Sequence, residues 1–228
     1  MNWELLQQPF EHLSRSYRVV AFDHPGSGET VVAPNALTFE HHVDTVFGIL
    51  DAFEIYRCVL AGESMGGTTA LACALRQPER FEARVLVDSS TSGFDNRSTR
   101  QFVDGLRADH VATMSLFVDL CVPEPNSDHL KQWLYRILMR PDVDSAIELL
   151  EAMYGIDLRP SLPGLDLPIL VVNGELDALP TSGVERARET AELLPDSRLH
   201  VVEGAGHVPT LTRPEEVASV MQAFLAEH

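Results

Sequence analysis

The chain has 228 residues, with 17 Lys and Arg against 34 Asp and Glu, so its formal net charge at pH 7 is -17. A charge of this sign repels phosphate groups, and we therefore expect neither a nucleic acid nor an anionic membrane surface as a partner. The length is sufficient for one hydrophobic core with an inserted subdomain, and no apolar run approaches the roughly 20 residues that a membrane-spanning helix needs.

The first part of the chain alternates between helical and strand patterns. Apolar residues recur at helical spacing over residues 3–13 and 39–53. β-branched and aromatic residues predict strands over residues 17–22, 58–61 and 83–88. Strands that are apolar throughout and alternate with helices indicate a mostly parallel sheet covered by helices on both faces, so we predict an α/β fold.

The strand pattern disappears between residues 92 and 160. Apolar residues there recur at helical spacing and are interrupted by prolines, which predicts three or four inserted helices. We expect these helices to form a lid, with Met114, Phe117 or Trp133 among the side chains that face a pocket. The predicted organisation is a first part of the core at residues 1–91, the helical lid at residues 92–160 and a second part of the core at residues 161–228. Within this last part, strands are predicted over residues 167–173 and 198–202, and helices over residues 184–194 and 214–226.

The strongest chemical signal is the pattern Gly-x-Ser-x-Gly, in which Ser64 is the central residue. A strand pattern precedes it and a helical pattern of small residues follows, which predicts a sharp turn with the Ser64 hydroxyl at its apex. Gly62 and Gly66 allow the two arms of such a turn to approach closely. The alternative interpretation is an ordinary connection rich in small residues. We favour a nucleophile, because suitable partners follow in the expected chain order.

A serine hydroxyl is a poor nucleophile at neutral pH, so Ser64 needs an imidazole to accept its proton and a carboxylate to orient that imidazole. His207 is the predicted base, because it lies in a glycine-rich loop just after a predicted strand. Two carboxylates compete for the third role. We favour Asp177, because it follows a strand, completes the order Ser, Asp, His and is followed by Pro180, which fits a rigid turn. Asp88 ends the neighbouring strand and is the alternative acid. Glu175 is a third choice.

Four segments together resemble the α/β-hydrolase superfamily over nearly the whole chain. They are residues 22–28, residues 62–67, residues 173–177, and residues 204–207 followed by Arg-Pro-Glu at 213–215. The resemblance implies an α/β-hydrolase fold in which Ser64 attacks a carbonyl carbon, an acyl-enzyme forms and water activated by His207 releases it. It also implies that the Met65 N–H is one donor of the oxyanion hole, and it implies no metal or organic cofactor. A serine at position 64 differs from the aspartate that dehalogenases and epoxide hydrolases of this superfamily carry there.

One departure from the superfamily concerns the N-terminal segment. Relatives carry, before the residues that match Trp3, a strand ending in a His-Gly turn that supplies a second oxyanion N–H. That strand lies between the strands that end at Asp23 and Gly62 here. Either these two strands close up against each other, or the sequence is an N-terminally truncated fragment of a longer chain. We favour the second interpretation.

The predicted function is that of a serine hydrolase of a small carboxylic ester, a lactone or a thioester, similar to carboxylesterases and enol-lactonases. A carbon–carbon bond hydrolase of the same fold is the enzymatic alternative, and a non-catalytic scaffold is the alternative from another class. The expected partner is a small ester-like molecule, and the protein is expected to be a monomer or a homodimer. Cys58, Cys73 and Cys121 have no metal-ligand spacing, and their odd number predicts free thiols in the cytoplasm.

Overall fold

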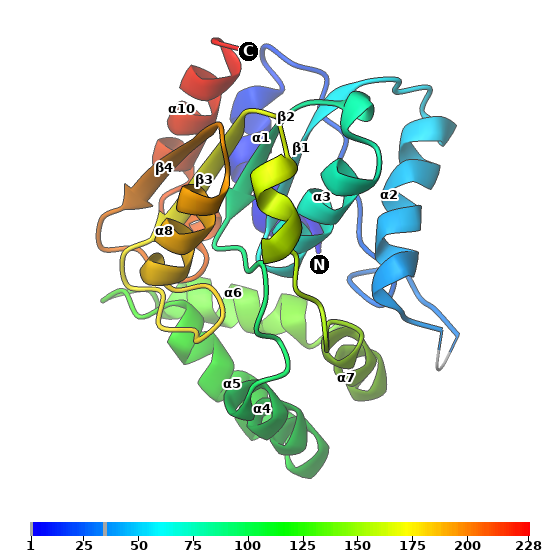
Figure 1. Ribbon diagram of the computed structural model, residues 1–228. Coiled ribbons are helices and arrows are strands. Elements are labelled where there is room, and N and C mark those ends of the chain that lie inside the picture. The colour runs from blue at the N-terminus through cyan, green and yellow to red at the C-terminus, as the bar shows by residue number, and fades with distance from the viewer. Residues whose placement is uncertain (1, 34–35) are drawn as a thin grey trace.

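The computed structural model of the protein describes residues 2–33 and 36–228, and a four-stranded parallel sheet is its centre (Figure 1). The strands lie in the order β1 (Cys58–Glu63), β2 (Phe81–Val87), β3 (Ile169–Gly174) and β4 (Ser197–Val202). Every residue of β3 is buried, because helices cover both faces of the sheet and strands in such sheets are apolar on both sides.

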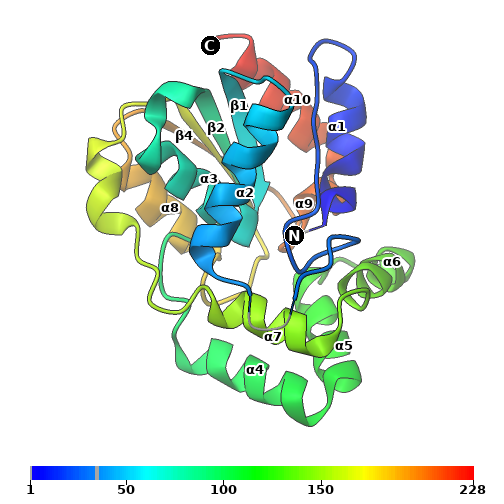
Figure 2. The ribbon, with the colours of Figure 1, turned by 90° about the vertical axis from the view of Figure 1, so that its right-hand side faces the viewer.

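Side chains of alternate residues along each strand point to two separate cores. On one face, Leu86, Ile169 and Val171 pack with α2 (Phe39–Ala52), α3 (Met65–Arg76) and α8 (Val184–Leu193). On the other face, Val85, Val87 and Val172 pack with α1 (Gln7–Leu13) and α10 (Pro214–Leu225). Figure 2 shows the two helical layers on opposite sides of the strands. The remaining short elements are α9 (Pro209–Thr212) and three 3-10 helices, η1 (Trp3–Leu6), η2 (Pro78–Arg80) and η3 (Arg159–Gly164).

Four helices lie together beyond one end of the sheet (Figures 1 and 2). They are α4 (Arg97–Ala108), α5 (His110–Cys121), α6 (Asp128–Leu138) and α7 (Val143–Glu151). Side-chain oxygens of Asn96, Asp109 and Asp142 accept backbone N–H groups at the starts of α4, α5 and α7, as N-cap residues do. Val103, Leu106, Met114 and Ile147 form the small core that these helices share.

The prediction of a strand over residues 17–22 is wrong, because no strand is assigned there. The segment does not pair with β1, so the two do not close up against each other. Instead, residues 18–22 and residues 57–63 both line a cavity of about 590 Å³. Strand geometry depends on hydrogen bonds to a neighbouring strand, and a β-branched sequence without such a neighbour has no ladder to join. Whether the sequence is a fragment stays a prediction.

In the part of the chain that the structure describes, no helix combines the length and the apolar character required to cross a membrane. The three cysteines are all free. Cys73 is buried, and burial raises the pKa of its thiol to about 12, so this thiol is protonated at neutral pH.

Candidate active site

Ser64 occupies the turn between β1 and α3 with φ 53° and ψ -123°. This backbone conformation is rare for a residue with a side chain and costs about 1–3 kcal/mol. The turn is as tight as the glycine pattern predicted: a Cβ added to Gly62 would lie 2.3 Å from the carbonyl carbon of Gly66. A Cβ on Gly67 would lie 1.7 Å from the Ser89 hydroxyl oxygen, so the start of α3 is equally close to the end of β2.

The imidazole of His207 lies between Ser64 and Asp177, although the three residues are far apart in the sequence. Its Nε2 is 3.0 Å from Ser64 Oγ, and its Nδ1 is 2.9 Å from Asp177 Oδ2. His207 is only 3% exposed. The arrangement is consistent with Nδ1–H donating to the carboxylate, which leaves Nε2 free to accept a proton from the hydroxyl.

Asp177 accepts two further hydrogen bonds. The Leu179 N–H donates to Oδ1 at 2.9 Å, and the Ser182 hydroxyl donates to Oδ2 at 2.7 Å. Burial alone would raise the pKa of Asp177, but the hydrogen bond and charge of His207, with these two donors, lower it below its ordinary value. Sequence reasoning missed Ser182, whose Oγ is also 3.1 Å from His207 Nδ1. It belongs to no motif, so only the fold could reveal it.

Asp88, the alternative acid, lies at the same edge of the sheet with no exposed surface. Its Oδ1 accepts the Gly174 N–H at 2.9 Å, while its Oδ2 has no partner among the described atoms. Burial, and after it the Asp177 carboxylate, raise the pKa of Asp88 well above its usual range. Asp88, Asp177 and His207 offer atoms within 4.8 Å of one another, close enough to hold a metal ion. Asp177 and His207 already hydrogen-bond each other, so a metal would have to replace that contact.

Glu63, next to the nucleophile candidate, connects the turn to the segment after His207. Its Oε1 accepts a hydrogen bond of 2.6 Å from the Thr210 hydroxyl, and both residues are buried. Burial raises the pKa of Glu63 to about 7, against the effect of this hydrogen bond. The sequence motif leaves this position unspecified, so no signal pointed to the contact.

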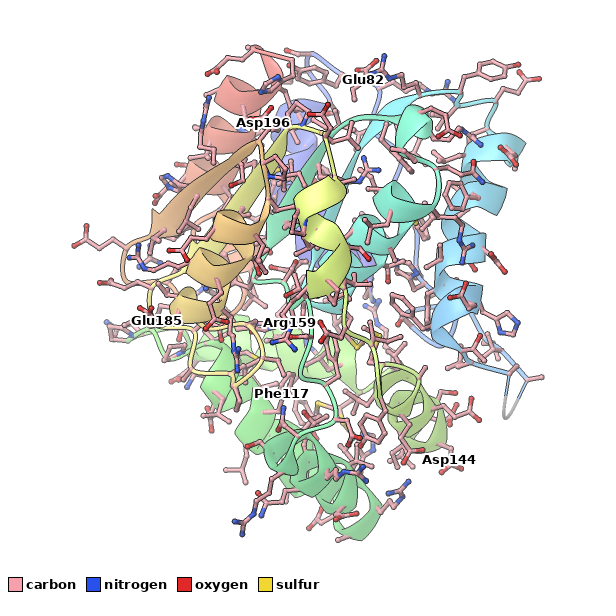
Figure 3. All side chains as sticks on the ribbon, in the orientation of Figure 1. Glu82, Phe117, Asp144, Arg159, Glu185 and Asp196 are labelled. Carbon is pink, nitrogen blue, oxygen red and sulfur yellow. The ribbon has the colours of Figure 1, made fainter. Side chains whose placement is uncertain are left out.

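A cavity of about 180 Å³ opens beside Ser64, with apolar side chains from the four-helix layer as most of its wall. Met114 and Phe117 line it, and Figure 3 labels Phe117 within the group of helices below the sheet. The expectation for Trp133 is wrong, because this side chain packs instead with Leu134 and its neighbours in another apolar cluster. Met65, the predicted oxyanion donor, is the first residue of α3, where backbone N–H groups have no partner within the helix.

Asn2 also lines this cavity and was not singled out in the sequence. It is 7% exposed. Its Oδ1 accepts the Glu4 N–H at 2.8 Å, whereas its Nδ2 has no hydrogen-bond partner among the described atoms. A buried amide donor without a partner is costly unless a ligand satisfies it.

Comparisons with known proteins support the same architecture. A family model described as "Alpha/beta hydrolase family" matches residues 2–220. The putative carbamate hydrolase RutD of Pseudomonas syringae pv. syringae (strain B728a) is 26% identical, covering 94% of this chain and 85% of that protein. The pimeloyl-[acyl-carrier protein] methyl ester esterase of Aliivibrio fischeri (strain MJ11) is 29% identical, covering 100% of this chain and 91% of that protein. The crystal structure of the enol-lactonase from Burkholderia xenovorans LB400 superposes with a TM-score of 0.88 at 22% identity, covering 99% of this chain and 87% of that one.

Proposed function

Because this chain belongs to the alpha/beta hydrolase family, we propose that it is a serine hydrolase of carboxylic esters. The predicted fold, a parallel sheet covered by helices on both faces, is confirmed. The observation that carries the proposal is the continuous path from Ser64 Oγ through both nitrogens of His207 to Asp177, with contacts of 3.0 and 2.9 Å. The activities of two similar proteins, a methyl ester esterase and an enol-lactonase, are consistent with it.

In the proposed mechanism, His207 Nε2 takes the proton of Ser64 as Oγ attacks the carbonyl carbon of the ester. The same nitrogen then gives that proton to the departing alkoxide, which leaves an acyl group on Oγ. A water molecule loses a proton to Nε2 as its oxygen attacks the acyl carbon. When the bond between this carbon and Oγ breaks, Nε2 returns the proton to Oγ, so the carboxylic acid leaves and the Ser64 hydroxyl is restored. Asp177 remains ionised throughout, because its hydrogen bonds favour the charged form, and it stabilises the imidazolium that forms in each half-reaction.

The negative oxygen that develops on the carbonyl requires donors aimed at it. We assign the Met65 N–H as one donor, since it follows the nucleophile at the start of α3. The Asn2 Nδ2 is the proposed second donor, because it is buried in the wall of the same cavity and lacks a partner among the described atoms. Loss of one such donor typically reduces kcat by about 10²–10³.

The proposed substrate is a small, uncharged ester. The described lining of the cavity contains no Lys or Arg that could bind a carboxylate or phosphate, and its apolar side chains suit a hydrocarbon group. More than half of the residues in that wall come from the segment 92–160, so we assign this segment as a lid that selects the substrate.

Two measurements test this proposal. A fluorophosphonate probe should label the purified protein, and Ser64→Ala should abolish labelling. Short-chain p-nitrophenyl esters should be hydrolysed, with Ser64→Ala about 10⁶-fold slower in kcat. A well-folded protein that neither reacts with the probe nor hydrolyses any ester of the series would contradict the proposal and favour a non-catalytic scaffold. Turnover of vinylogous diketones without turnover of esters would instead favour carbon–carbon bond hydrolysis.

A further inference from the structure

The loop that carries His207 contacts the end of α5 and the turn that follows it through two consecutive backbone N–H groups. The His207 N–H donates to the Cys121 carbonyl at 2.9 Å, and the Gly206 N–H donates to Glu124 Oε1 at 2.8 Å. The approach is close, because a Cβ on Gly206 would lie 2.3 Å from Pro123 Cδ and 2.5 Å from the Cys121 carbonyl oxygen. The four-helix layer and the histidine loop are therefore directly connected.

Glu124 is unusual among the acidic residues of this chain because it is only 6% exposed. Its second oxygen, Oε2, has no hydrogen-bond partner in the described part of the chain. The turn that carries it is ordered by the Ser127 hydroxyl, which donates to the Glu124 carbonyl at 2.5 Å. Burial of a carboxylate is costly unless hydrogen bonds compensate for it. The hydrogen bond from the histidine loop provides this compensation for Glu124, which links the loop to the helical layer.

The histidine loop needs external support. It lies outside any strand or helix, and it contains two glycines, of which Gly204 has φ +64°. After His207 the chain is held by the hydrogen bond from Thr210 to Glu63. Before His207, Glu124 provides the only side-chain acceptor for the Gly206 N–H among the described residues. The imidazole is thus fixed from both sides, from the sheet and from the helical layer.

We propose that Glu124 is a positioning residue, whose carboxylate holds the Gly206 N–H and so keeps the His207 imidazole against Ser64. The helical layer then contributes to the proton relay as well as to the wall of the cavity. This inference rests on the proposed function. A displacement of about 1 Å in a reacting group can cost about a hundredfold in rate, so a loosened loop should be visible in kcat.

The chain offers a matched control for this test. The exposed Glu175 makes the same kind of contact with the same loop, because its Oε2 accepts the Gly204 N–H at 2.9 Å. Glu124→Ala removes the buried acceptor, Glu124→Gln keeps an acceptor oxygen at that place, and Glu175→Ala removes the exposed acceptor. Each variant is first checked for folding by circular dichroism and thermal unfolding.

We expect Glu124→Ala to lower kcat for a p-nitrophenyl ester about 10–100-fold with little change in KM, because the cavity wall is retained. Glu124→Gln should recover most of kcat, and Glu175→Ala should stay close to the unmodified chain. Amide hydrogen exchange at Gly206 and His207, followed by NMR, should become faster in Glu124→Ala and not in Glu175→Ala.

Two results would overturn the positioning role. One is a folded Glu124→Ala protein with unchanged kcat and unchanged exchange at Gly206. The other is an equal loss in Glu124→Ala and Glu175→Ala, which would show a general sensitivity of the loop. Fluorophosphonate labelling separates this failure from failure of the proposed function. If the unmodified chain is labelled and Glu124→Ala is labelled at the same rate, only the role of Glu124 fails; if the unmodified chain is not labelled, the hydrolase proposal fails first and the role of Glu124 with it.

Discussion

The ends of strands β2 and β3 carry two buried aspartates with opposite properties. Asp88 directly follows β2, and Asp177 lies three residues beyond the end of β3, so both are at the same edge of the sheet. Asp177 accepts hydrogen bonds from His207, Leu179 and Ser182, whereas Asp88 accepts one from Gly174 and leaves an oxygen unpaired. The pKa of Asp177 is lowered and the pKa of Asp88 is raised.

This comparison shows that hydrogen-bond donors and neighbouring charges together set the direction in which burial leaves the pKa of a carboxyl, and with it the role that the group can take. Desolvation acts on both residues and disfavours the ionised form in each. Only at Asp177 do enough donors converge to outweigh it. An ionised carboxylate can stabilise an imidazolium, whereas a neutral acid next to it can only donate a hydrogen bond. The structure therefore supports Asp177 rather than Asp88 for the proposed acid.

Replacing each of the two carboxyl groups by an amide gives the largest effect expected from this comparison. Asp177→Asn should lower kcat for a p-nitrophenyl ester about 10³–10⁴-fold, because an amide can present its N–H to His207 and favour the wrong tautomer. Asp88→Asn, the matched control on the neighbouring strand, should change kcat less than about tenfold, since the raised pKa of Asp88 already favours its neutral form. Equal losses in the two variants, measured as kcat under saturating substrate, would remove the distinction between the two carboxylates.

The second expected effect concerns stability and its dependence on pH. The pKa of Asp88 is raised in the folded protein. The contribution of its protonated form to the free energy of unfolding is therefore complete below the unfolded pKa of about 3.9, and it is lost as the pH rises toward the folded pKa. Asp88→Asn cannot ionise, and its amide oxygen can still accept the Gly174 N–H. The free energy of unfolding of Asp88→Asn, relative to the unmodified chain, should therefore increase with pH by up to about 1.4 kcal/mol per unit.

Urea unfolding at several pH values between 5 and 8 measures this difference. The slope of the free energy against urea should be the same for both proteins, so that midpoints can be compared directly. A difference that does not vary with pH would mean that Asp88 is ionised in the folded chain over this whole range, contrary to the comparison.

Much of this arrangement could be predicted from the sequence because local patterns determine it. The Gly-x-Ser-x-Gly turn, the apolar strands around Leu86 and Val171 and the glycine-rich loop of His207 each have a local cause in backbone sterics or burial. The strand expected at residues 17–22 failed for a non-local reason, since a strand needs a neighbour with which to pair.

The residues that hold the site in place could not be predicted either, because their contacts are also non-local. Ser182 and Glu124 belong to no motif, and their contacts with Asp177 and Gly206 join segments that only the fold brings together. Chain order and Pro180 favoured Asp177 over Asp88 in the sequence, but only the contacts show how the surroundings of the two carboxylates differ. Both residues follow a strand, and the sequence does not show how many donors surround each carboxylate.

The smallest expected effect comes from removing one hydrogen-bond donor from Asp177, so that its surroundings become more similar to those of Asp88. Ser182→Ala removes one of the donors to Asp177 Oδ2, which should raise the pKa of this carboxyl from its lowered value and weaken its hold on His207. A hydrogen bond to a charged group contributes about 1.5–3 kcal/mol, and the remaining donors compensate in part, so we expect kcat to fall about tenfold. Ser90→Ala is the matched control, because the Ser90 hydroxyl donates to the Thr181 carbonyl beside Ser182 and not to Asp177. A loss of kcat in Ser90→Ala as large as in Ser182→Ala would show that the stiffness of this loop, and not the donor to Asp177, accounts for the effect.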